Sequence, residues 1–362
     1  MRALSLYSGA GGFDIGIQRA GFEVVWANDY DKNACASYAL NIGDHIRCGD
    51  ILDFLPDLDN LSDIDLVVGG PPCQGFSVAG KMDPNDPRSR HVWNFVDVVK
   101  KLSPSIFLME NVKALGKLSK WEPLREKLLE RFRSLGYATN FVVLNASDFD
   151  VPQARERVFF VGFKMNSIIV PDLSKMLEPY RKTGPTVRKA IGHLDIAGTG
   201  NNRQLSKAKI TLTANPILRR SPFAGMMFNG LGRPIRLDGF SATLPASMGG
   251  NKTPIIDNEE LYNSEPNWVV EYHNTLIKGG KPMEYQVAPD RLRRLTVQEA
   301  SAIQTFPHDY VFQGSQSSCF RQIGNAVPPN LGERIGRMLM DYLINDVIID
   351  LPYQLQIAEL DA

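Results

Sequence analysis

The sequence predicts an α/β protein in which a doubly wound, mostly parallel sheet is joined to a smaller, irregular domain. Up to about residue 163, short β-rich runs alternate with helical stretches, the pattern of a parallel sheet with crossover helices. From 164 to 290 the regular spacing is lost and Gly, Pro, Asn and Ser recur. From Arg291 a regular pattern returns. It ends in a helix predicted after Pro328 and Pro329, because proline suits the first helical positions.

Each expected element has its own pattern. The strand-like runs are residues 3–7, 23–29, 64–70, 105–111, 141–146 and 157–163, rich in β-branched, aromatic and aliphatic residues. Apolar residues recur at helical spacing in 93–102 and 121–135. We find no internal repeat, and expect residues 1–163 and 318–362 to form the larger domain. Residues 164–317 would form the smaller domain and a hinge segment.

Composition narrows the class of protein. The chain has 362 residues, of which 43% are hydrophobic, but no run approaches the roughly 18 apolar residues of a membrane-spanning helix. The N-terminal residues enter a strand pattern at once, so we expect no signal peptide. The four cysteines lie without CxxC spacing, which argues against a disulfide framework or a metal site and favours a reducing cytoplasm.

The formal net charge of zero hides an uneven distribution of charge. Between Lys164 and Gly239 there are thirteen Lys or Arg residues and four acids, an excess of nine positive charges. Glycine, proline and phenylalanine interrupt this stretch, as around Arg219 and Arg220. It is either a solvated, loop-rich surface or a module that faces phosphates.

Cys73 differs from the other cysteines in its setting. It follows the predicted strand 64–68 and a turn stiffened by Pro71 and Pro72, whose rings fix φ and disfavour a helix. Ligands of open α/β sheets bind beyond the carboxyl ends of the strands. We therefore interpret Cys73 as a nucleophile, and Cys35, Cys48 and Cys319 as small buried hydrophobic residues.

The first two strands end in residues suited to a nucleoside. A glycine-rich turn, Ser8–Gly12, follows the first strand but fails the dinucleotide fingerprint, because the third glycine would fall on Asp14. Asp29 closes the second strand and could accept hydrogen bonds from a ribose. Asp50 follows a further strand end and could read an adenine amino group. Ribose and adenine sites without a pyrophosphate cradle indicate S-adenosylmethionine rather than NAD.

Two later segments add polar groups to this edge. The run 106–112 carries Glu110 near its end, and Gln153-Ala154-Arg155-Glu156-Arg157 follows further on. In an extended stretch Arg155 and Arg157 lie on one face. Alone, either segment would be read as a surface ion pair of little energetic value.

Taken together, these motifs resemble those of the DNA (cytosine-5)-methyltransferases. They are SGAGG, GDI, GGPPCQGFS, ENV, QARER, Arg294-Leu295-Thr296, Gln304-Thr305-Phe306-Pro307 and Gln322–Pro329. The stretch 164–290 matches the family's target recognition region in position and size. The chain departs from the family at His91-Val92-Trp93, where a glycine or asparagine is usual, and at Asp29, where Glu is commoner.

The resemblance implies a Rossmann-like, S-adenosylmethionine-dependent fold and a covalent mechanism. Cys73 would add to C6 of a flipped-out cytosine, so that C5 can attack the donor's methyl group. Glu110, with a pKa raised by burial, would protonate N3. Arg157 would bind the O2 edge and steady Glu110, and Arg155 would lie beside it on the ring or a phosphate.

The resemblance also assigns binding residues. The donor site would consist of Tyr7, Ser8, Gly9, Gly11, Gly12, Asp29, Tyr30, Asp50, Ile51, Pro71, Trp93 and Asn325. Tyr30 and Trp93 would stack on the donor, or else belong to the core. The DNA contacts would come from Gln74, Ser77, Lys81, Arg88, Arg90, Gln153, Arg219, Arg220, Arg233, Arg236, Thr243 and Leu244. A loop at 78–92 would close over the cytosine, and Thr243-Leu244 resembles the Thr-Leu pair of DNA-recognition domains.

The family resemblance implies double-stranded DNA as partner, a monomer, and a bacterial cytoplasm with association to the nucleoid. It suggests the modification half of a restriction–modification pair, with a cognate endonuclease encoded separately. An RNA cytosine-5 methyltransferase of the same fold is the alternative. A DNA-binding regulator without catalysis is disfavoured by the intact set Cys73, Glu110, Arg155 and Arg157.

Overall fold

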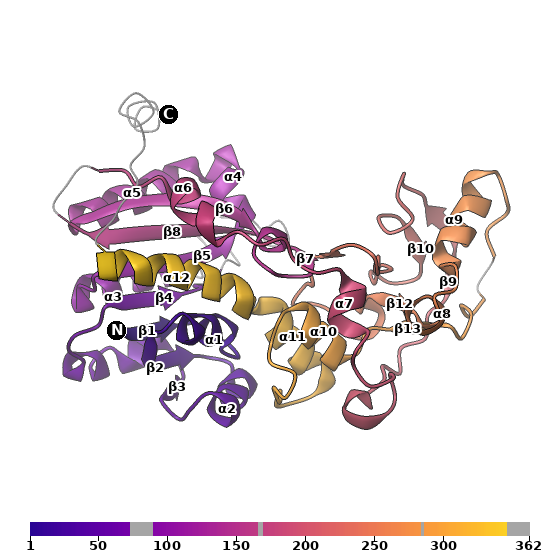
Figure 1. The fold of residues 1–362 in the computed structure, drawn as a ribbon, viewed down its shortest axis with the longest axis horizontal. Coiled ribbons are helices and arrows are strands. Elements are labelled where there is room, and N and C mark those ends of the chain that lie inside the picture. The colour runs from indigo at the N-terminus through magenta and orange to yellow at the C-terminus, as the bar shows by residue number, and fades with distance from the viewer. Residues whose placement is uncertain (73–89, 166–168, 284–285, 346–362) are drawn as a thin grey trace. The chain divides into compact units, whose positions relative to one another are not determined.

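The computed structural model describes residues 1–72, 90–165, 169–283 and 286–345. The chain divides into two compact units (Figure 1). Unit 1 consists of Met1–Asp150, Glu156–Thr183 and Val327–Ala362, and unit 2 of Val151–Arg155 and Gly184–Ala326.

Unit 1 is built on a seven-stranded sheet with the strand order β3-β2-β1-β4-β5-β8-β6. The strands are β1 (Arg2–Leu6), β2 (Glu23–Asp29), β3 (Ile46–Cys48), β4 (Leu66–Gly69), β5 (Ile106–Val112), β6 (Tyr137–Asn145) and β8 (Glu156–Lys164). Neighbouring strands from β3 to β5 are parallel, whereas β8 runs antiparallel to both β5 and β6. The predicted doubly wound, mostly parallel sheet is confirmed.

Helices pack on this sheet and enclose its apolar side chains. They are α1 (Gly12–Arg19), α2 (Lys32–Asn41), α3 (Arg90–Leu102), α4 (Lys113–Lys117), α5 (Glu122–Ser134), α6 (Leu173–Leu177) and α12 (Pro329–Asn345). In the core, Phe107 stacks on Phe132 of α5 with ring centroids 3.9 Å apart. The C-terminal helix α12 packs against α1 so closely that a Cβ on Gly16 would lie 2.4 Å from the carbonyl oxygen of Pro329.

Unit 2 is less regular and has two small cores. Its elements are β7 (Gln153–Ala154), β9 (Leu212–Ile217), β10 (Met226–Phe228), β11 (Ser241–Ala242), β12 (Ile255–Asp257), β13 (Leu292–Arg294), α7 (Val187–Ile191), α8 (Asn258–Asn263), α9 (Trp268–Ile277), α10 (Val297–Ile303) and α11 (Gln316–Asn325). The strands pair two by two as β9–β10, β7–β11 and β12–β13. One core joins α7, α10 and α11, and the other joins β9, β10 and α9.

The unit boundaries differ from the expected domain boundaries at 163 and 318. Residues up to 183 belong to unit 1, because α6 packs against β6 and α12. Residues 318–326 belong to unit 2, because Cys319, Phe320 and Ile323 of α11 lie in its core. Sequence periodicity marks where elements begin, but it does not tell which core a helix joins.

Three local expectations need correction. Cys48 is exposed rather than a buried hydrophobic residue, because β3 is an edge strand. Residues 90–92 are not loop but the first turn of α3. The stretch from Gln153 to Arg157 is not one strand: β7 ends at Ala154, and Arg155 donates its N–H to the carbonyl of Gln153 at 3.0 Å.

Cys35 and Cys319 are buried, as predicted. No helix among the described residues is both long and apolar enough to cross a bilayer.

Candidate active site

The turn between β1 and α1 brings four predicted donor-binding residues together. Tyr7, Gly9 and Gly11 all have positive φ, at 55°, 56° and 72°. A Cβ on Gly11 would lie 2.1 Å from Cδ1 of Ile42, whereas a Cβ on Gly9 would meet nothing within 4 Å. The turn is therefore tightly packed behind Gly11 and open at Gly9, where a ligand could approach the backbone. Gly12 begins α1.

Acidic side chains lie at the end of β2 and just after β3, at the same edge of the sheet. Asp29 accepts hydrogen bonds from the N–H groups of Gly9 and Asp31, each at 2.8 Å, and burial raises the pKa of its carboxyl group. Because each carboxylate oxygen has a second lone pair, Asp29 can still accept a hydrogen bond from a ligand hydroxyl. Asp50 caps a short 3-10 helix through the N–H of Leu52 at 3.0 Å, and Ile51 is buried.

The aromatic residues of the predicted donor site differ in their surroundings. Burial raises the pKa of the Tyr7 phenol, whose oxygen donates to the carbonyl of His91 at 3.2 Å. Trp93 is half-buried and packs against the main core of unit 1. Tyr30 is 77% exposed, so it does not belong to the core.

A buried ion pair lies where β4 and β5 end. Nε of Arg157 is 3.0 Å from Oε1 of Glu110, and their side chains are 17% and 12% exposed. The antiparallel pairing of β5 with β8 brings these two residues together, since Val112 lies opposite Arg157. Asn111 donates to the carbonyl of the buried Pro71 at 3.2 Å, which ties the segment before Cys73 to β5. A carboxylate and a guanidinium held in this way could act together on one polar ring edge.

Within unit 2, the segment Val151–Arg155 is joined to Thr243 and Leu244. The buried amide of Gln153 accepts from the N–H of Leu244 at 2.9 Å and donates to Gln304 at 2.5 Å. Thr243 Oγ1 donates to the carbonyl of Ala154 at 3.0 Å. Arg155 is 1% exposed and donates to the carbonyl of Leu244 at 3.5 Å. Thr243 and Leu244 thus hold the main chain around Arg155, and both amide atoms of Gln153 are bonded within unit 2.

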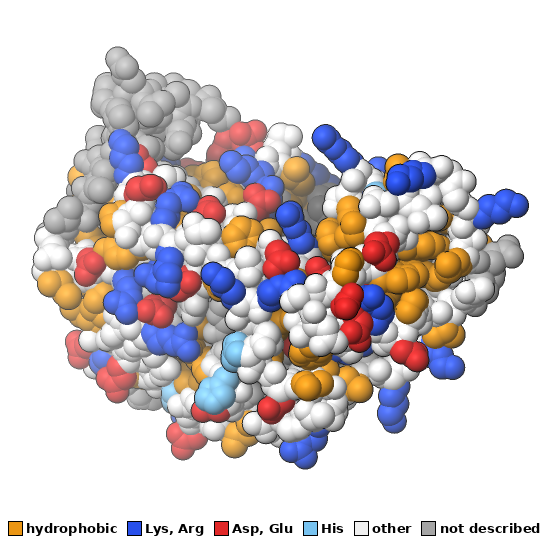
Figure 2. Space-filling view, turned by 45° about the vertical axis from the view of Figure 1, so that its right-hand side comes forward, with side chains coloured by type: hydrophobic (Ala, Val, Ile, Leu, Met, Phe, Trp, Pro, Cys, Tyr) orange, Lys and Arg blue, Asp and Glu red, His pale blue; other side chains and the backbone are white. Residues whose placement is uncertain are grey.

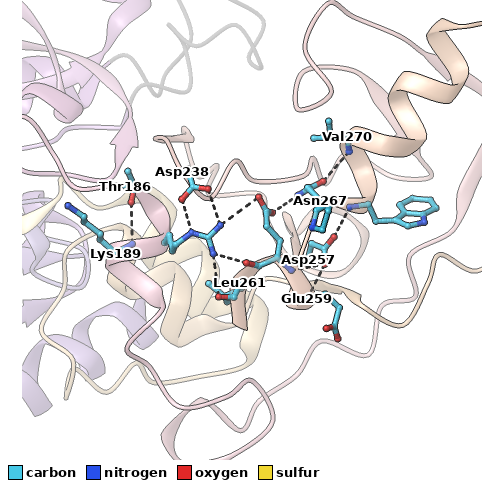
Figure 3. A network of polar contacts seen from close by, with 12 residues as sticks. Thr186, Lys189, Asp238, Asp257, Glu259, Leu261, Asn267 and Val270 are labelled. Atoms are coloured by element: carbon cyan, nitrogen blue, oxygen red, sulfur yellow. Dashed lines mark hydrogen bonds and ion pairs between the residues drawn. The ribbon is translucent and has the colours of Figure 1, made fainter. Parts of the chain in front are cut away.

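Helix α7 fixes the chain just before Thr243. The carboxylate of Asp238 accepts from Nε and Nη2 of Arg188 at 2.6 and 2.9 Å (Figure 3). The N–H of Arg188 also donates to the carbonyl of Leu237 at 2.8 Å, so both side chain and main chain of α7 hold this segment.

The predicted phosphate contacts of unit 2 are exposed. They are Arg219, Arg220, Arg233 and Arg236. Between residues 189 and 236 there are eight exposed Lys or Arg side chains and one acid, Asp195. On the face drawn in Figure 2, cationic and anionic side chains are interspersed over the described part of the surface. Asn325 is exposed at the end of α11, and Arg90 is exposed at the start of α3.

Five predicted residues lie outside the described part of the chain: Cys73, Gln74, Ser77, Lys81 and Arg88. Four side chains behind the glycine turn were not among the predicted site residues, namely Ser5, Asp14, Tyr38 and His45. Asp14 could have been noticed, because it is an acid inside the apolar pattern Phe13–Ile17 that predicts a buried helix face.

Comparison with known proteins identifies the family. The profile described as C-5 cytosine-specific DNA methylase matches residues 1–341. Type II methyltransferase M1.HphI of Haemophilus parahaemolyticus is 32% identical over 356 residues, covering 95% of this chain and 87% of that protein. Type II methyltransferase M.FnuDI of Fusobacterium nucleatum is 32% identical over 351 residues, covering 95% of each.

A solved structure shares the fold. The S. pombe Dnmt2 methyltransferase matches with a TM-score of 0.65 and 19% sequence identity, covering 95% of this chain and 99% of that one. At this identity the likeness concerns the fold alone. With the profile match over residues 1–341, however, the resemblance seen in the motifs is confirmed: the chain belongs to the C-5 cytosine-specific DNA methylases and is a DNA (cytosine-5)-methyltransferase.

Proposed function

We propose that the chain methylates C5 of a flipped-out cytosine in a specific duplex site, using S-adenosylmethionine and a covalent bond between Cys73 and C6. The observation that carries the proposal is the buried pair of Glu110 and Arg157, 3.0 Å apart at the end of β5. Asn111, the residue after Glu110, donates a hydrogen bond to the carbonyl of Pro71, which lies two residues before Cys73 in the sequence.

The residue types account for the chemistry. The Cys73 thiolate adds to C6, and the electrons of the C5–C6 double bond move toward C5 and N3. In its protonated form, Glu110 donates a proton to N3, which prevents negative charge from building up on the ring. Arg157 holds the Glu110 carboxyl group and the O2 edge, and Arg155 binds the ring or a phosphate. After C5 has gained the methyl group, the N3 proton returns to Glu110, a water-mediated base removes the C5 proton, and the thiolate leaves C6.

The residues around the glycine turn fit the methyl donor. Gly9 leaves the backbone open to a ligand, and Asp29 retains lone pairs for ribose hydroxyls. Asp50 and Ile51 would bind the adenine, with Tyr7, Ser8, Gly11, Gly12, Pro71 and Trp93 around the donor and Asn325 completing the site. Tyr30 would stack on the donor, since its ring is exposed. Bound S-adenosylmethionine would supply an electrophilic methyl group.

Unit 2 would bind the DNA. Between residues 189 and 236 it has eight exposed cationic side chains and a single acid. This excess of positive charge suits phosphate contacts that position a duplex. The cytosine must leave the base stack before Cys73 can reach C6. The flipped-out cytosine and its flanking phosphates would be held by Gln74, Ser77, Lys81, Arg88 and Arg90. Of these, Lys81, Arg88 and Arg90 would contact the phosphates.

The curated relatives are Type II methyltransferases. We therefore propose that this chain is the modification enzyme of a restriction–modification system, acting as a monomer on bacterial DNA beside a separately encoded endonuclease.

The test is the capture of the covalent intermediate. Duplex DNA with 5-fluorocytosine at the target should form a denaturation-resistant adduct with the wild-type chain, because fluorine blocks removal of the C5 substituent. Cys73→Ser should form no such adduct and transfer no methyl group, yet bind S-adenosylmethionine normally. A Cys73→Ser variant that still methylates DNA would overturn the proposal.

A further inference from the structure

Asp14 is a buried carboxylate that the proposed mechanism does not use. It lies in the first turn of α1 and is 0% exposed. Burying a carboxylate costs free energy unless its oxygens are hydrogen-bonded. Ser5 from β1 and Tyr38 from α2 are bonded to it, and His45 just before β3 is bonded to Tyr38. These segments lead to the turns that carry the donor-binding residues.

The hydrogen bonds around Asp14 all run in one direction. Oδ1 of Asp14 is 2.7 Å from Oγ of Ser5, and Oδ2 is 2.8 Å from the Tyr38 hydroxyl. An ionised carboxylate only accepts, so both hydroxyl groups must donate their single proton to it. The Tyr38 oxygen can then only accept, and Nε2 of His45, 2.9 Å away, donates to it.

The same direction extends to Ser8 in the glycine turn. Its Oγ lies 2.9 Å from Oγ and 3.3 Å from the carbonyl oxygen of Ser5. Since the Ser5 proton is given to Asp14, both of these oxygens are acceptors, and the Ser8 proton points inward. The Ser8 lone pairs are then left for a ligand. Ser8 is half-buried and precedes Gly9, over which the structure leaves open space.

We propose that Asp14 is a positioning residue for the methyl donor: through Ser5 it fixes the Ser8 hydroxyl as a hydrogen-bond acceptor for an N–H or O–H group of S-adenosylmethionine. The inference rests on the proposed function. If Asp14 were neutral, Ser5 could turn its proton to Ser8, and Ser8 would present a proton to the same ligand group. Burial raises the pKa of Asp14 to about 6, so an ionised Asp14 is retained at neutral pH against its desolvation cost, as is common at functional sites.

The test is calorimetric titration of the full chain with S-adenosylmethionine in the absence of DNA. Ser8→Ala and Asp14→Asn should each weaken binding about tenfold, the effect of one buried hydrogen bond. The double variant should also lose about tenfold, because both changes remove the same contact. A loss of about a hundredfold in the double variant, or an unchanged affinity in Asp14→Asn, would overturn the inference.

Two further variants keep the test decisive. Ser5→Ala removes the hydroxyl that joins Asp14 to Ser8 and keeps the bonds from Ser8 to the Ser5 carbonyl and from Tyr38 to Asp14, so it replaces Asp14→Asn if that variant does not fold. Thr139→Val removes another fully buried hydroxyl, on β6, and should leave donor affinity unchanged. A wild-type chain that does not bind S-adenosylmethionine would refute the proposed function. Normal wild-type binding with an unchanged Ser5→Ala affinity would refute only the role of Asp14.

Discussion

Removing Arg157 should destabilise the fold as well as abolish catalysis. Arg157→Met leaves the Glu110 carboxylate, with a side chain only 12% exposed, without the cation that lies 3.0 Å away. At that distance and an effective dielectric constant of about 20, the gross attraction is about 5.5 kcal/mol. Breaking a buried pair from one side costs about 3 to 5 kcal/mol, because the remaining charge stays desolvated. We expect about 3 kcal/mol, since both side chains retain some exposure.

Urea unfolding followed by tryptophan fluorescence measures this loss. The double variant Arg157→Met/Glu110→Gln should recover most of the stability, because the carboxylate charge is removed together with the guanidinium charge, but it should transfer no methyl group. Lys113→Met is the matched control: the side chains of its pair with Glu156 are 47% and 44% exposed, and exposed pairs contribute less than about 1 kcal/mol. A double variant no more stable than Arg157→Met would refute this reasoning about the pair.

Three further perturbations test other parts of the structure. Gly11→Ala should lower the unfolding free energy by about 2 kcal/mol or more, because φ is 72° and the added Cβ would lie 2.1 Å from Ile42. A urea midpoint equal to that of Gly9→Ala, where the space around the Cβ is open, would contradict this packing argument. Folding raises the pKa of Asp14 from 3.8 to about 6, so ionisation is harder in the folded chain, and the unfolding free energy of wild type should fall by about 3 kcal/mol as pH rises from about 4 to 6. Urea titrations should find this fall absent in Asp14→Asn, and the same pH dependence in both chains would exclude Asp14 as its source. Asp238→Asn should lower the unfolding free energy by less than about 1 kcal/mol, because the carboxylate is exposed. Arg188→Met should lower it further, because the carbonyl of Glu260 then loses a donor at 2.6 Å; equal urea midpoints for the two variants would argue against this difference.

The strand pattern of unit 1 could be predicted because its strands are buried. The run 23–29 coincides with β2, and the other five runs overlap β1, β4, β5, β6 and β8. These strands are apolar on both faces, as in sheets covered by helices. A strand end before Asp50 was expected, but the range of β3 was not predicted, because Ile46-Arg47-Cys48 is short and has exposed residues at the sheet edge. Nothing in the run 157–163 distinguishes a strand antiparallel to its neighbours from a parallel one.

The candidate site could be predicted as residue types at strand ends, but not as a set of contacts. Glu110 and Arg157 were expected near one another, and the pairing of β5 with β8 supplies the reason. The network of Ser5, Asp14, Tyr38 and His45 depends on three segments meeting, which spacing along the chain does not encode. The burial of Gln153 likewise depends on Leu244 and Gln304, which are distant in sequence.

Methyl transfer to cytosine in DNA, and not in RNA, can be measured on both nucleic acids in parallel. Genomic DNA and total RNA should each be incubated with the full chain and S-adenosylmethionine carrying a labelled methyl group, with Cys73→Ser as the control. We predict label in DNA, at C5 of cytosine, in the wild-type reaction only. Label in RNA and none in DNA would show that the substrate is RNA and that the chain is an RNA cytosine-5 methyltransferase of the same fold.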